Sequence, residues 1–537
     1  MAAAMFSCYS CIDKSYLLGS DLLATDQQFD IFTAEFPLEE IYMKMADSLS
    51  GYSQTKVTIG AVRDKDFGLT KRGCALTLVP FYDSLDFGKN AKFKSFHFTL
   101  QRDTISIPDE SQRHILQSIN VYELTDSLGK AYDINTKVKH GTKRITKGVP
   151  VYNGSEDTLA FFFTKEFGEK YMGIGINDTK DMKTYTGKFP GIYLETDEPI
   201  GDGGRINLFK LQLQYNSSYY TITGNYASLA FSAEYDGVAK DTSFLFYFSP
   251  DAMYDVDSLI YNSRGSLPQY CLNVSDTESS ECRATDRILI EGGGGLKPVF
   301  SASEIRDKVI AEISKHGNPE EAAINKATIS LPFVFPDDHT KMSLYPQILS
   351  PTCRIRTDNG LSFGGLTDSS DKGEDQGDVN RSLLKYAPDV TYHTQSILNL
   401  TDLSKMSNYD IWLLIMANEV QKSNKSQAET DEMSDYYRAM MYSSYYNNMY
   451  NGYGYGYGGY GYGYGGYGYG GYGDYYSNYY SYALMQQYYN STSSTETTTT
   501  ELDNYRYYHG VLRGPEDPVA HPTFKITYSL PKDAEKQ

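Results

Sequence analysis

The chain is dominated by short segments in which apolar and polar residues alternate, as they do in β-strands that bury one face. In the first half the alternation is clear in "KVTIGAVRD", "CALTLVPFY", "FKSFHFTLQRD", "QSINVYEL", "GIYLETDEP", "RINLFKLQLQYN" and "TSFLFYFSP". It returns in "AAINKATISLPFVF", "QILSPTCRIRT", "DVTYHTQSILNL", "NYDIWLLIMANEV" and finally "PTFKITYSL". Since successive side chains of a strand point to opposite faces, these segments predict antiparallel sheets around buried cores.

Two segments have helical spacing instead. "EDTLAFFFTKEFGEKYM" predicts one helix that begins after a capping Asp157 and runs through Phe167. "SASEIRDKVIAEISKHG" predicts another, with Ser301 or Ser303 as its cap and Gly317 as its end. Between two strands, the four glycines of "DRILIEGGGGLKPVF" predict a sharp turn, because the Lys-Ser/Thr pair of a phosphate-binding loop is absent.

These elements predict a mainly β protein with two antiparallel, jelly-roll-like β-sandwich domains and a few short helices. The mixed, polar sequence from Tyr16 to about Tyr52 predicts a tether that leads into a first strand. The Ser-rich stretch from Asp255 to Thr285 predicts a domain boundary. We therefore expect a signal-peptide remnant, lipid-bearing cysteine and tether at 1–26, a first domain at 27–260 and a second at 261–537.

A Tyr/Gly tract, "NGYGYGYGGYGYGYGGYGYGGYGDYY", interrupts the second domain. Because a convincing strand follows it, the tract is predicted to be an insertion, spanning about 421–507, rather than a tail. The entropy of glycine and the lack of aliphatic residues predict a disordered loop without a core. Its tyrosines are also suited to stacking on sugars, on one another or on a cell-wall polymer.

The charge balance restricts the partners. Lys and Arg total 49 and Asp and Glu total 68, which gives a formal net charge of -19. Such a charge opposes unassisted binding to nucleic acid and to anionic lipid surfaces, so we expect no nucleic-acid partner. No run of eighteen apolar residues occurs, so any membrane attachment is expected to be peripheral or covalent.

The six cysteines include one informative pair near the start. The small and apolar run "AAAMFS" directly precedes Cys8, and Ser7 and Ser10 place a small residue before Cys8 and Cys11, as at the end of a lipoprotein signal peptide. The charged start and most of the apolar centre of such a signal are missing, so we expect Met1 to lie inside the true signal or the chain to have been edited. A redox dithiol or half a zinc site would need a context that the neighbouring sequence lacks. Cys271 and Cys282 are candidates for a hairpin disulfide, the alternative being two separate thiols.

Catalytic chemistry has no sequence signature here. The eight histidines form no i, i+4 pair on a predicted helix, and no serine lies in a Gly-x-Ser-x-Gly elbow. The acidic run around Asp368, Glu374 and Asp378 lacks the spacing of an EF-hand loop and is expected to be a solvated turn. No paired carboxylates can be named for glycoside cleavage. We therefore predict no catalytic residue, metal ligand or cofactor, and a hydrolase is the least favoured function.

Several motifs follow one another along the chain: "SCIDKSYLLGSDLL", "VRDKDFGLTKRGCALTL", "INVYEL", "FFTKEFGEKYM", "FPGIYLETD", "GGRINLFKLQLQY", "IEGGGGLKPVF", "INKATISLPF" and "HPTFKITYSL". Taken together and in this order, they resemble a Bacteroidetes lipoprotein family, domain of unknown function 4270. The resemblance covers nearly the whole chain outside the Tyr/Gly tract and implies an envelope lipoprotein without a known activity. It favours Cys11 over Cys8 as the lipid-bearing residue. Lys14, directly after Asp13, departs from the acid-rich pattern of surface export, so the face of the membrane stays open.

Six tripeptides look like the acceptor sequence of Bacteroidetes general O-glycosylation, although turns and helix caps produce similar strings. Their hydroxyl-bearing residues are Ser48, Ser84, Thr104, Ser127, Thr158 and Ser258.

The sequence thus leads us to expect a non-enzymatic lipoprotein of the outer membrane, held by an N-terminal lipid anchor. Its expected role is binding or assembly, with other envelope proteins or glycans as partners. The alternative is a surface glycan-binding lipoprotein that uses tyrosine platforms.

Overall fold

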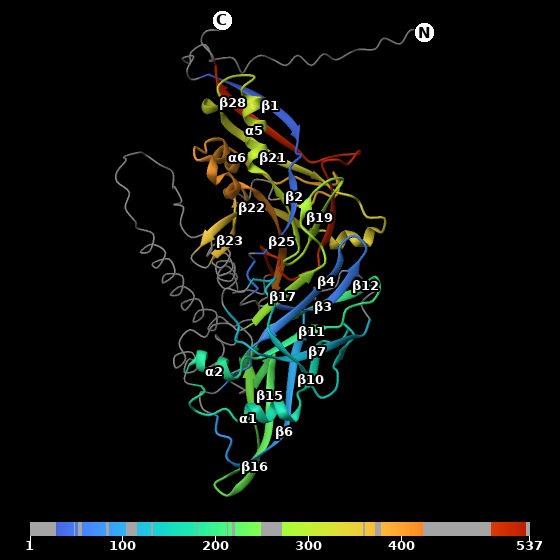
Figure 1. The fold of residues 1–537 in the computed structure, drawn as a ribbon, viewed down its shortest axis with the longest axis vertical. Coiled ribbons are helices and arrows are strands. Elements are labelled where there is room, and N and C mark those ends of the chain that lie inside the picture. Colours follow the sequence, from blue (N-terminus) through green and yellow to red (C-terminus); the bar gives the residue numbers. More distant parts are fainter. Residues whose placement is uncertain are drawn as a thin grey trace, which may run out of the picture.

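The computed structural model describes residues 28–47, 49–51, 56–81, 85–103, 115–129, 133–179, 181–211, 213–216, 221–248, 271–357, 360–370, 377–422 and 496–532. Within this part the protein is mainly β, with few helices, and every strand ladder is antiparallel. The described residues form an elongated body with two β units, one above the other in Figure 1. The predicted fold class is confirmed at this level.

The first unit contains one sheet of thirteen strands and two short helices. Its sheet strands are β3 (Lys56–Asp64), β4 (Gly68–Leu76), β5 (Val79–Pro80), β6 (Lys89–Arg102), β7 (Gln117–Leu124), β8 (His140–Arg144), β9 (Val151–Tyr152), β10 (Thr158–Phe162), β11 (Ile192–Thr196), β12 (Gly203–Lys210), β15 (Tyr226–Tyr235), β16 (Val238–Tyr247) and β17 (Cys271–Thr277). A small hairpin of β13 (Leu213–Asn216) and β14 (Thr221–Gly224) is separate, and the helices are α1 (Lys165–Met172) and α2 (Met182–Lys188).

The core of the first unit is aromatic. Phe96, Phe98 and Leu100 alternate along β6 and are fully buried, as the sequence predicts. Phe96 contacts the rings of Phe163, Phe167 and Tyr171, which belong to α1 or lie just before it. The helix therefore closes one face of the sheet.

The second unit places two sheets and two helices around one core. Its four-stranded sheet has the order β1 (Phe29–Pro37), β28 (Thr523–Pro531), β21 (Ala323–Pro332) and β24 (Lys385–Tyr386). Its seven-stranded sheet contains β18 (Cys282–Arg283), β2 (Ile41–Met45), β20 (Leu296–Phe300), β25 (Ile411–Lys422), β22 (Ile348–Thr357), β23 (Gly360–Gly365) and β26 (Glu496–Leu502). The ladder of β19 (Arg287–Glu291) and β27 (His509–Arg513) and the helices α5 (Ala302–Ile313) and α6 (Thr391–Leu398) complete the unit.

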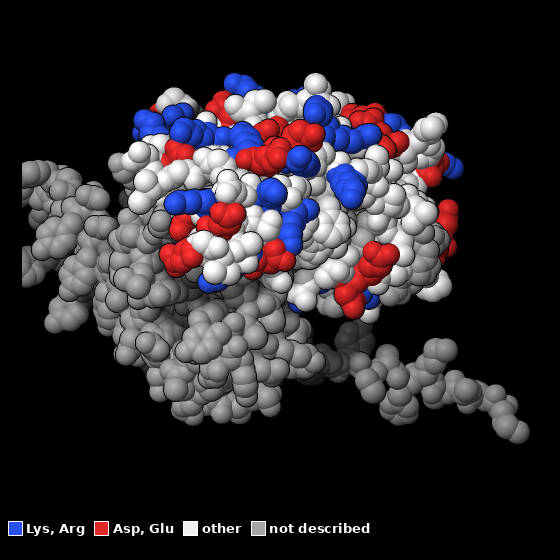
Figure 2. Space-filling view, turned by 90° about the horizontal axis from the view of Figure 1, so that it is seen from below, with Lys and Arg blue, Asp and Glu red and all other residues white. Residues whose placement is uncertain are grey.

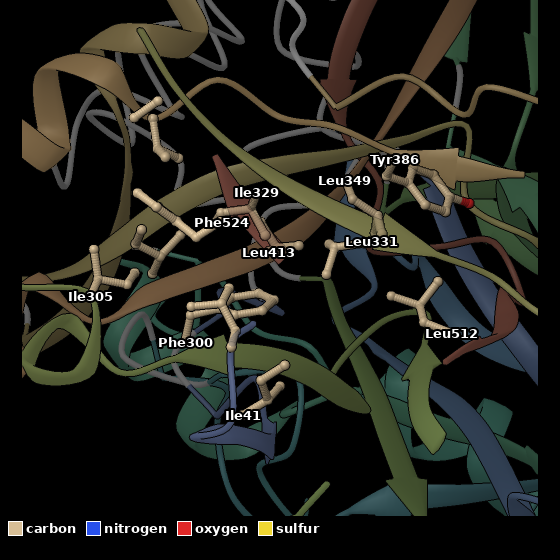
Figure 3. Close-up of a cluster of buried hydrophobic side chains, with 14 of the residues drawn as sticks. Ile41, Phe300, Ile305, Ile329, Leu331, Leu349, Tyr386, Leu413, Leu512 and Phe524 are labelled. Atoms are coloured by element: carbon tan, nitrogen blue, oxygen red, sulfur yellow. The ribbon is translucent and has the colours of Figure 1, made fainter. Parts of the chain in front are cut away.

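Side chains from both sheets meet in the core of the second unit (Figure 3). Ile329 and Phe524 come from the four-stranded sheet, whereas Phe300 and Leu413 come from the seven-stranded sheet. Ile305 of α5 packs in the same cluster. This arrangement buries one face of each sheet, which is the sandwich-like packing that the alternating pattern predicts.

The predicted domain boundaries are wrong at both edges. The segment interpreted as a tether contains β1 and β2, and both belong to the second unit. β1 pairs with β28 at nine successive positions, from Phe29 opposite Pro531 to Pro37 opposite Thr523. β17, which was assigned to the second domain, pairs with β4 of the first unit. The second unit is thus built from both ends of the chain.

Two local predictions are also corrected. The helix predicted from Asp157 is strand β10 followed by α1, whose N-cap is Thr164, with its hydroxyl accepting from the Phe167 N–H. The strand predicted at "DVTYHTQSILNL" is helix α6. The second predicted helix is confirmed as α5, capped by Ser301.

The Tyr/Gly tract lies between two strands that pair with each other. β25 and β26 are in antiparallel register from Met416 opposite Leu502 to Lys422 opposite Glu496. Residues 423–495 lie outside the described part of the chain. The predicted insertion at 421–507 is therefore too wide, because its first two residues belong to β25 and its last twelve include β26 and the buried Tyr505 and Tyr507.

This pairing predicts that the tract can be excised. Replacing residues 423–495 by a two-residue Asn-Gly turn should leave the thermal unfolding midpoint unchanged or higher, because closing a shorter loop costs less entropy. Circular dichroism would measure the midpoint. A proline at Ala417, which is buried in β25 opposite Glu501, should lower it as a positive control. Loss of folding on excision alone would contradict the register.

Candidate functional site

The most unusual chemistry in the described residues is a buried charged cluster where the two units meet. It is built around the glycine turn between β19 and β20, and we call it the junction cluster. Its charged members are Arg72 of β4, Glu291 at the end of β19 and Lys297 of β20, each 1% exposed. His509, the first residue of β27, is also buried.

Lys297 closes the glycine turn from within. Its Nζ donates to the carbonyl oxygens of Glu291, Gly293 and Gly295 at 2.5, 2.9 and 3.0 Å. These bonds use the three donors of an ammonium group and satisfy carbonyls that would otherwise be buried without a partner. The lysine two residues after the last glycine therefore holds the turn in one conformation.

Each glycine of the turn is required sterically. A Cβ at any of the four positions would collide with a neighbour: Arg506 O at Gly292, the Arg72 guanidinium at Gly293, the Asn135 side chain at Gly294 and the Glu291 side chain at Gly295. Gly293 also has a φ of 60°, in the left-handed region that glycine adopts readily. The run "GGGG" thus reflects close packing and not a phosphate-binding loop.

Glu291 connects the turn to the first unit. Its carboxylate accepts from the hydroxyls of Thr277 and Thr70 at 3.1 and 3.4 Å and from the Leu296 N–H at 3.2 Å. Both threonines belong to strands of the first unit, β17 and β4. The carboxylate therefore bridges the two units.

Arg72 and His509 complete the contact. Arg72 reaches from β4 to the Asn504 carbonyl, to which its Nη1 donates at 3.1 Å. The His509 ring stacks on Phe67 of the first unit and contacts Tyr507, with centroid distances of 4.0 Å to both. Its Nε2 lies 3.6 Å from the Glu291 carboxylate, and neither ring nitrogen has a hydrogen-bond partner among the described residues.

Burial sets the electrostatics of the junction cluster. It lowers the pKa of Lys297 to about 7 and that of Arg72 to about 10, with the Glu291 charge opposing both shifts. Burial alone would raise the pKa of Glu291, but His509, the Leu296 N–H and Lys297 outweigh it and hold that pKa below its usual value. The charges of Glu291 and Lys297 therefore depend on each other, because each one favours the ionised form of the other.

A carboxylate beside a histidine and two hydroxyls is chemistry that enzymes use. Here, however, Thr70, Arg72, Glu291, Lys297 and His509 are each less than a tenth exposed, so substrate would have no access to them in this conformation. What the geometry does is fix the second unit against the first. An exposed ion pair between Arg287 and Asp66, at 2.9 Å, continues this connection at the surface.

The acidic run at 368–378 was predicted to be a solvated turn, and at Asp368 this prediction is wrong. Asp368 is not solvated: it is buried and accepts the Tyr392 and His393 N–H groups, so it caps α6 from 24 residues away. Burial raises the pKa of Asp368 to about 6. Residues 371–376 lie outside the described part of the chain, and the rest of it contains no group of three or more metal-ligating side chains.

His393 of α6 is buried with its Nε2 2.8 Å from the Tyr409 carbonyl oxygen. Burial lowers the pKa of His393 to about 4. The ring is therefore a neutral structural group near neutral pH.

The predicted cysteine sites have two outcomes. Cys8 and Cys11 lie outside the described residues. The candidate disulfide between Cys271 and Cys282 is not formed, because Cys282 is an exposed free thiol in β18 of the second unit while Cys271 is buried in β17 of the first. Cys271 instead shares a sheet face with Cys74, whose thiol pKa is raised by burial and by this second thiol. Short sequence separation was misleading because the strands diverge into different sheets.

Of the six candidate glycosylation sites, two lie in the described residues. Ser48, Ser84, Thr104 and Ser258 lie outside the described residues. Thr158, at the start of β10, is exposed, whereas Ser127, in the loop after β7, is half-buried. Their modification stays a prediction.

Comparison with protein-family models, with curated proteins and with solved structures finds no match to this chain. Among the described residues, no helix combines the length and the apolar character needed to cross a membrane.

The glycine turn generates a stability prediction with an internal control. Gly237 also has a positive φ, of 78°, but no neighbouring atom within 4 Å of the Cβ position. Gly237→Ala should therefore cost only the backbone strain, about 1 kcal/mol. Gly293→Ala should cost about 2 kcal/mol more, because the new methyl group displaces Arg72. Urea unfolding measures both, and equal losses would mean that Arg72 does not pack on the turn.

The lowered pKa of His393 predicts that the folded state loses stability in acid. Because its pKa is lower in the folded state, about 4 against 6.5, the unfolded chain binds more protons between these values and stability falls as pH falls through them. The loss should approach 1.4 kcal/mol per pH unit. Asp368, whose pKa is raised, opposes this slope.

The comparison of wild type with His393→Gln isolates the histidine. Urea unfolding at several pH values from 6.5 down to 4.5 should show a shallower loss of stability in the variant, with the Asp368 contribution retained. His339→Gln, at an exposed position, should follow the wild type. A parallel pH dependence for His393→Gln and wild type would rule out this role.

Proposed function

We propose that this chain is a lipid-anchored, non-enzymatic component of the bacterial outer envelope, with a role in binding or assembly at the outer membrane. The "SCIDKSYLLGSDLL" segment and the resemblance to the Bacteroidetes lipoprotein family suggest this function. Cys11 is the proposed attachment residue, with Cys8 as the alternative.

The observation that carries the proposal is how the N-terminal end joins the fold. The segment with both cysteines precedes β1 in the sequence, and β1 pairs along its whole length with β28. The Lys532 N–H donates to the Gln28 carbonyl at 2.9 Å, so the two ends of the described chain meet at the tip of the second unit (Figure 1). A load applied through the N-terminus would therefore be carried by a nine-pair ladder in a sheet.

This geometry suits an anchored protein. The stretch from Cys11 to Gln28 spans at most roughly 60 Å when fully extended. An anchor on Cys11 would hold the second unit near the membrane and direct the first unit away from it. Several acyl chains on one cysteine provide stable attachment, since each buried methylene contributes about 0.8 kcal/mol.

Lipid attachment is directly testable. The full chain, expressed behind a complete lipoprotein leader in a host that processes it, should incorporate radiolabelled palmitate and fractionate with membranes. Cys11→Ala should abolish both, because the acceptor thiol is lost, whereas Cys8→Ala should retain them. The reverse result would assign the anchor to Cys8, and an unchanged result in both single variants and the double variant would overturn the proposal.

A further inference from the structure

Acidic and basic side chains interleave over the far end of the first unit (Figure 2). Another segment of the first unit, which begins two residues after Asn135 at the glycine turn, carries cations only. The sequence "KVKHGTKRITK" at 137–147 includes β8, and no Asp or Glu occurs from 134 to 155. Five of its side chains are cationic and exposed: Lys137, Lys139, Lys143, Arg144 and Lys147. We call these five residues the β8 strip.

The strip is only lightly neutralised by its surroundings. Lys139 lies 3.6 Å from the exposed Asp126. The pKa of the exposed Glu166 is lowered mainly by hydrogen bonds to its own N–H and to Thr164, and Lys143 adds a smaller contribution. Arg144 donates from Nε to the amide oxygen of Asn120 at 2.7 Å. Within the described residues no ion pair involves Lys137, Lys143, Arg144 or Lys147. In a chain with a net charge of -19, this is a local excess of positive charge.

The backbone of the strip excludes one common kind of partner. β8 is the last strand in its sheet order, so one edge has no partner among the described strands. Its pairing with β7 is interrupted by a register shift between Tyr122 and Leu124. A short, irregular edge that carries Lys143 and Arg144 disfavours the addition of another strand. An acidic peptide bound by β-pairing is therefore a poor candidate.

The position of the strip excludes the membrane at the anchor as well. β8 pairs with β7, which lies in the first unit, whereas β1 and β28 lie at the opposite tip of the second unit (Figure 1). The remaining candidate is an extended ligand that is recognised through its negative charge alone. We propose that the β8 strip binds an anionic polysaccharide, a chain of sugars carrying carboxylate or sulfate groups. The exclusion of the membrane rests on the proposed lipid anchor, whereas the charge of the strip does not.

The binding mode follows from strand geometry. The five cations are spread over ten residue steps of chain, in which His140–Arg144 is strand; at about 3.3 Å per residue their span is at most about 33 Å. That length covers several sugar units of a polymer. Recognition through exposed ammonium and guanidinium groups depends on charge density, so binding is expected to weaken as salt increases.

The test uses fluorescently labelled dextran sulfate and polygalacturonate at low ionic strength, with neutral dextran as the uncharged reference. Anisotropy should show that the purified chain binds both anionic polymers and not neutral dextran. The triple variant Lys137→Gln, Lys143→Gln and Lys147→Gln should raise the Kd by about tenfold or more and reduce its salt dependence, because three cations are removed. These surface changes leave the core untouched.

A second set of lysines provides a control of equal charge. Lys89, Lys92 and Lys94 are exposed on β6, but acidic residues neutralise this set: Glu234 lies opposite Lys89, and Asp241 is 2.6 Å from the Lys94 ammonium. Their triple Gln variant should change the Kd less than twofold. Equal losses in both triple variants would mean that net charge alone is responsible, and would overturn the proposal. Absence of binding by the wild type, or preferential binding to anionic lipid vesicles, would overturn it as well.

Discussion

The relative position of the two units depends on charges that are held away from water. Lys297 is bonded to three carbonyls of the glycine turn, Glu291 accepts from threonines of the first unit, and Arg72 packs on Gly293. Removing one member of such a cluster would leave another buried without compensation, which is far more costly than losing an exposed pair. The junction therefore tolerates few geometries. The four successive glycines therefore allow close packing at the junction and do not make the turn flexible.

The same constraint shows why the sequence predicted strands well and this cluster poorly. Alternation along β6 predicts its buried face correctly, because it is a local property. Glu291, Arg72 and His509 are distant in sequence, and nothing near any of them indicates the others. The only local signal was the pair of charged residues that flank the glycines, Glu291 and Lys297. A charged residue beside a predicted turn is ordinarily interpreted as exposed, and here both are buried.

Long-range pairing explains the remaining errors. The α6 segment alternates well enough to suggest a strand, but Asp368 supplies a helix cap from a distant loop. "FDIFTAEFP" was assigned to a tether because its partner, β28, lies at the other end of the chain. Cys271 and Cys282 are close in sequence, yet their strands belong to different sheets. In each case the decisive contact was one that a local window does not contain.

The ladder between β1 and β28 also has a consequence for how the molecule is made. β28, the partner of β1, is the last of the described strands to be synthesised, so β1 emerges long before it can be paired. The four-stranded sheet cannot close until the chain has been made as far as Pro531, and contacts of such high separation are slow to form. Until then the chain remains partly open. That delay leaves Phe32 and Phe36 of β1, which pack against the core of the second unit in the finished fold, without their apolar partners until β28 has been made.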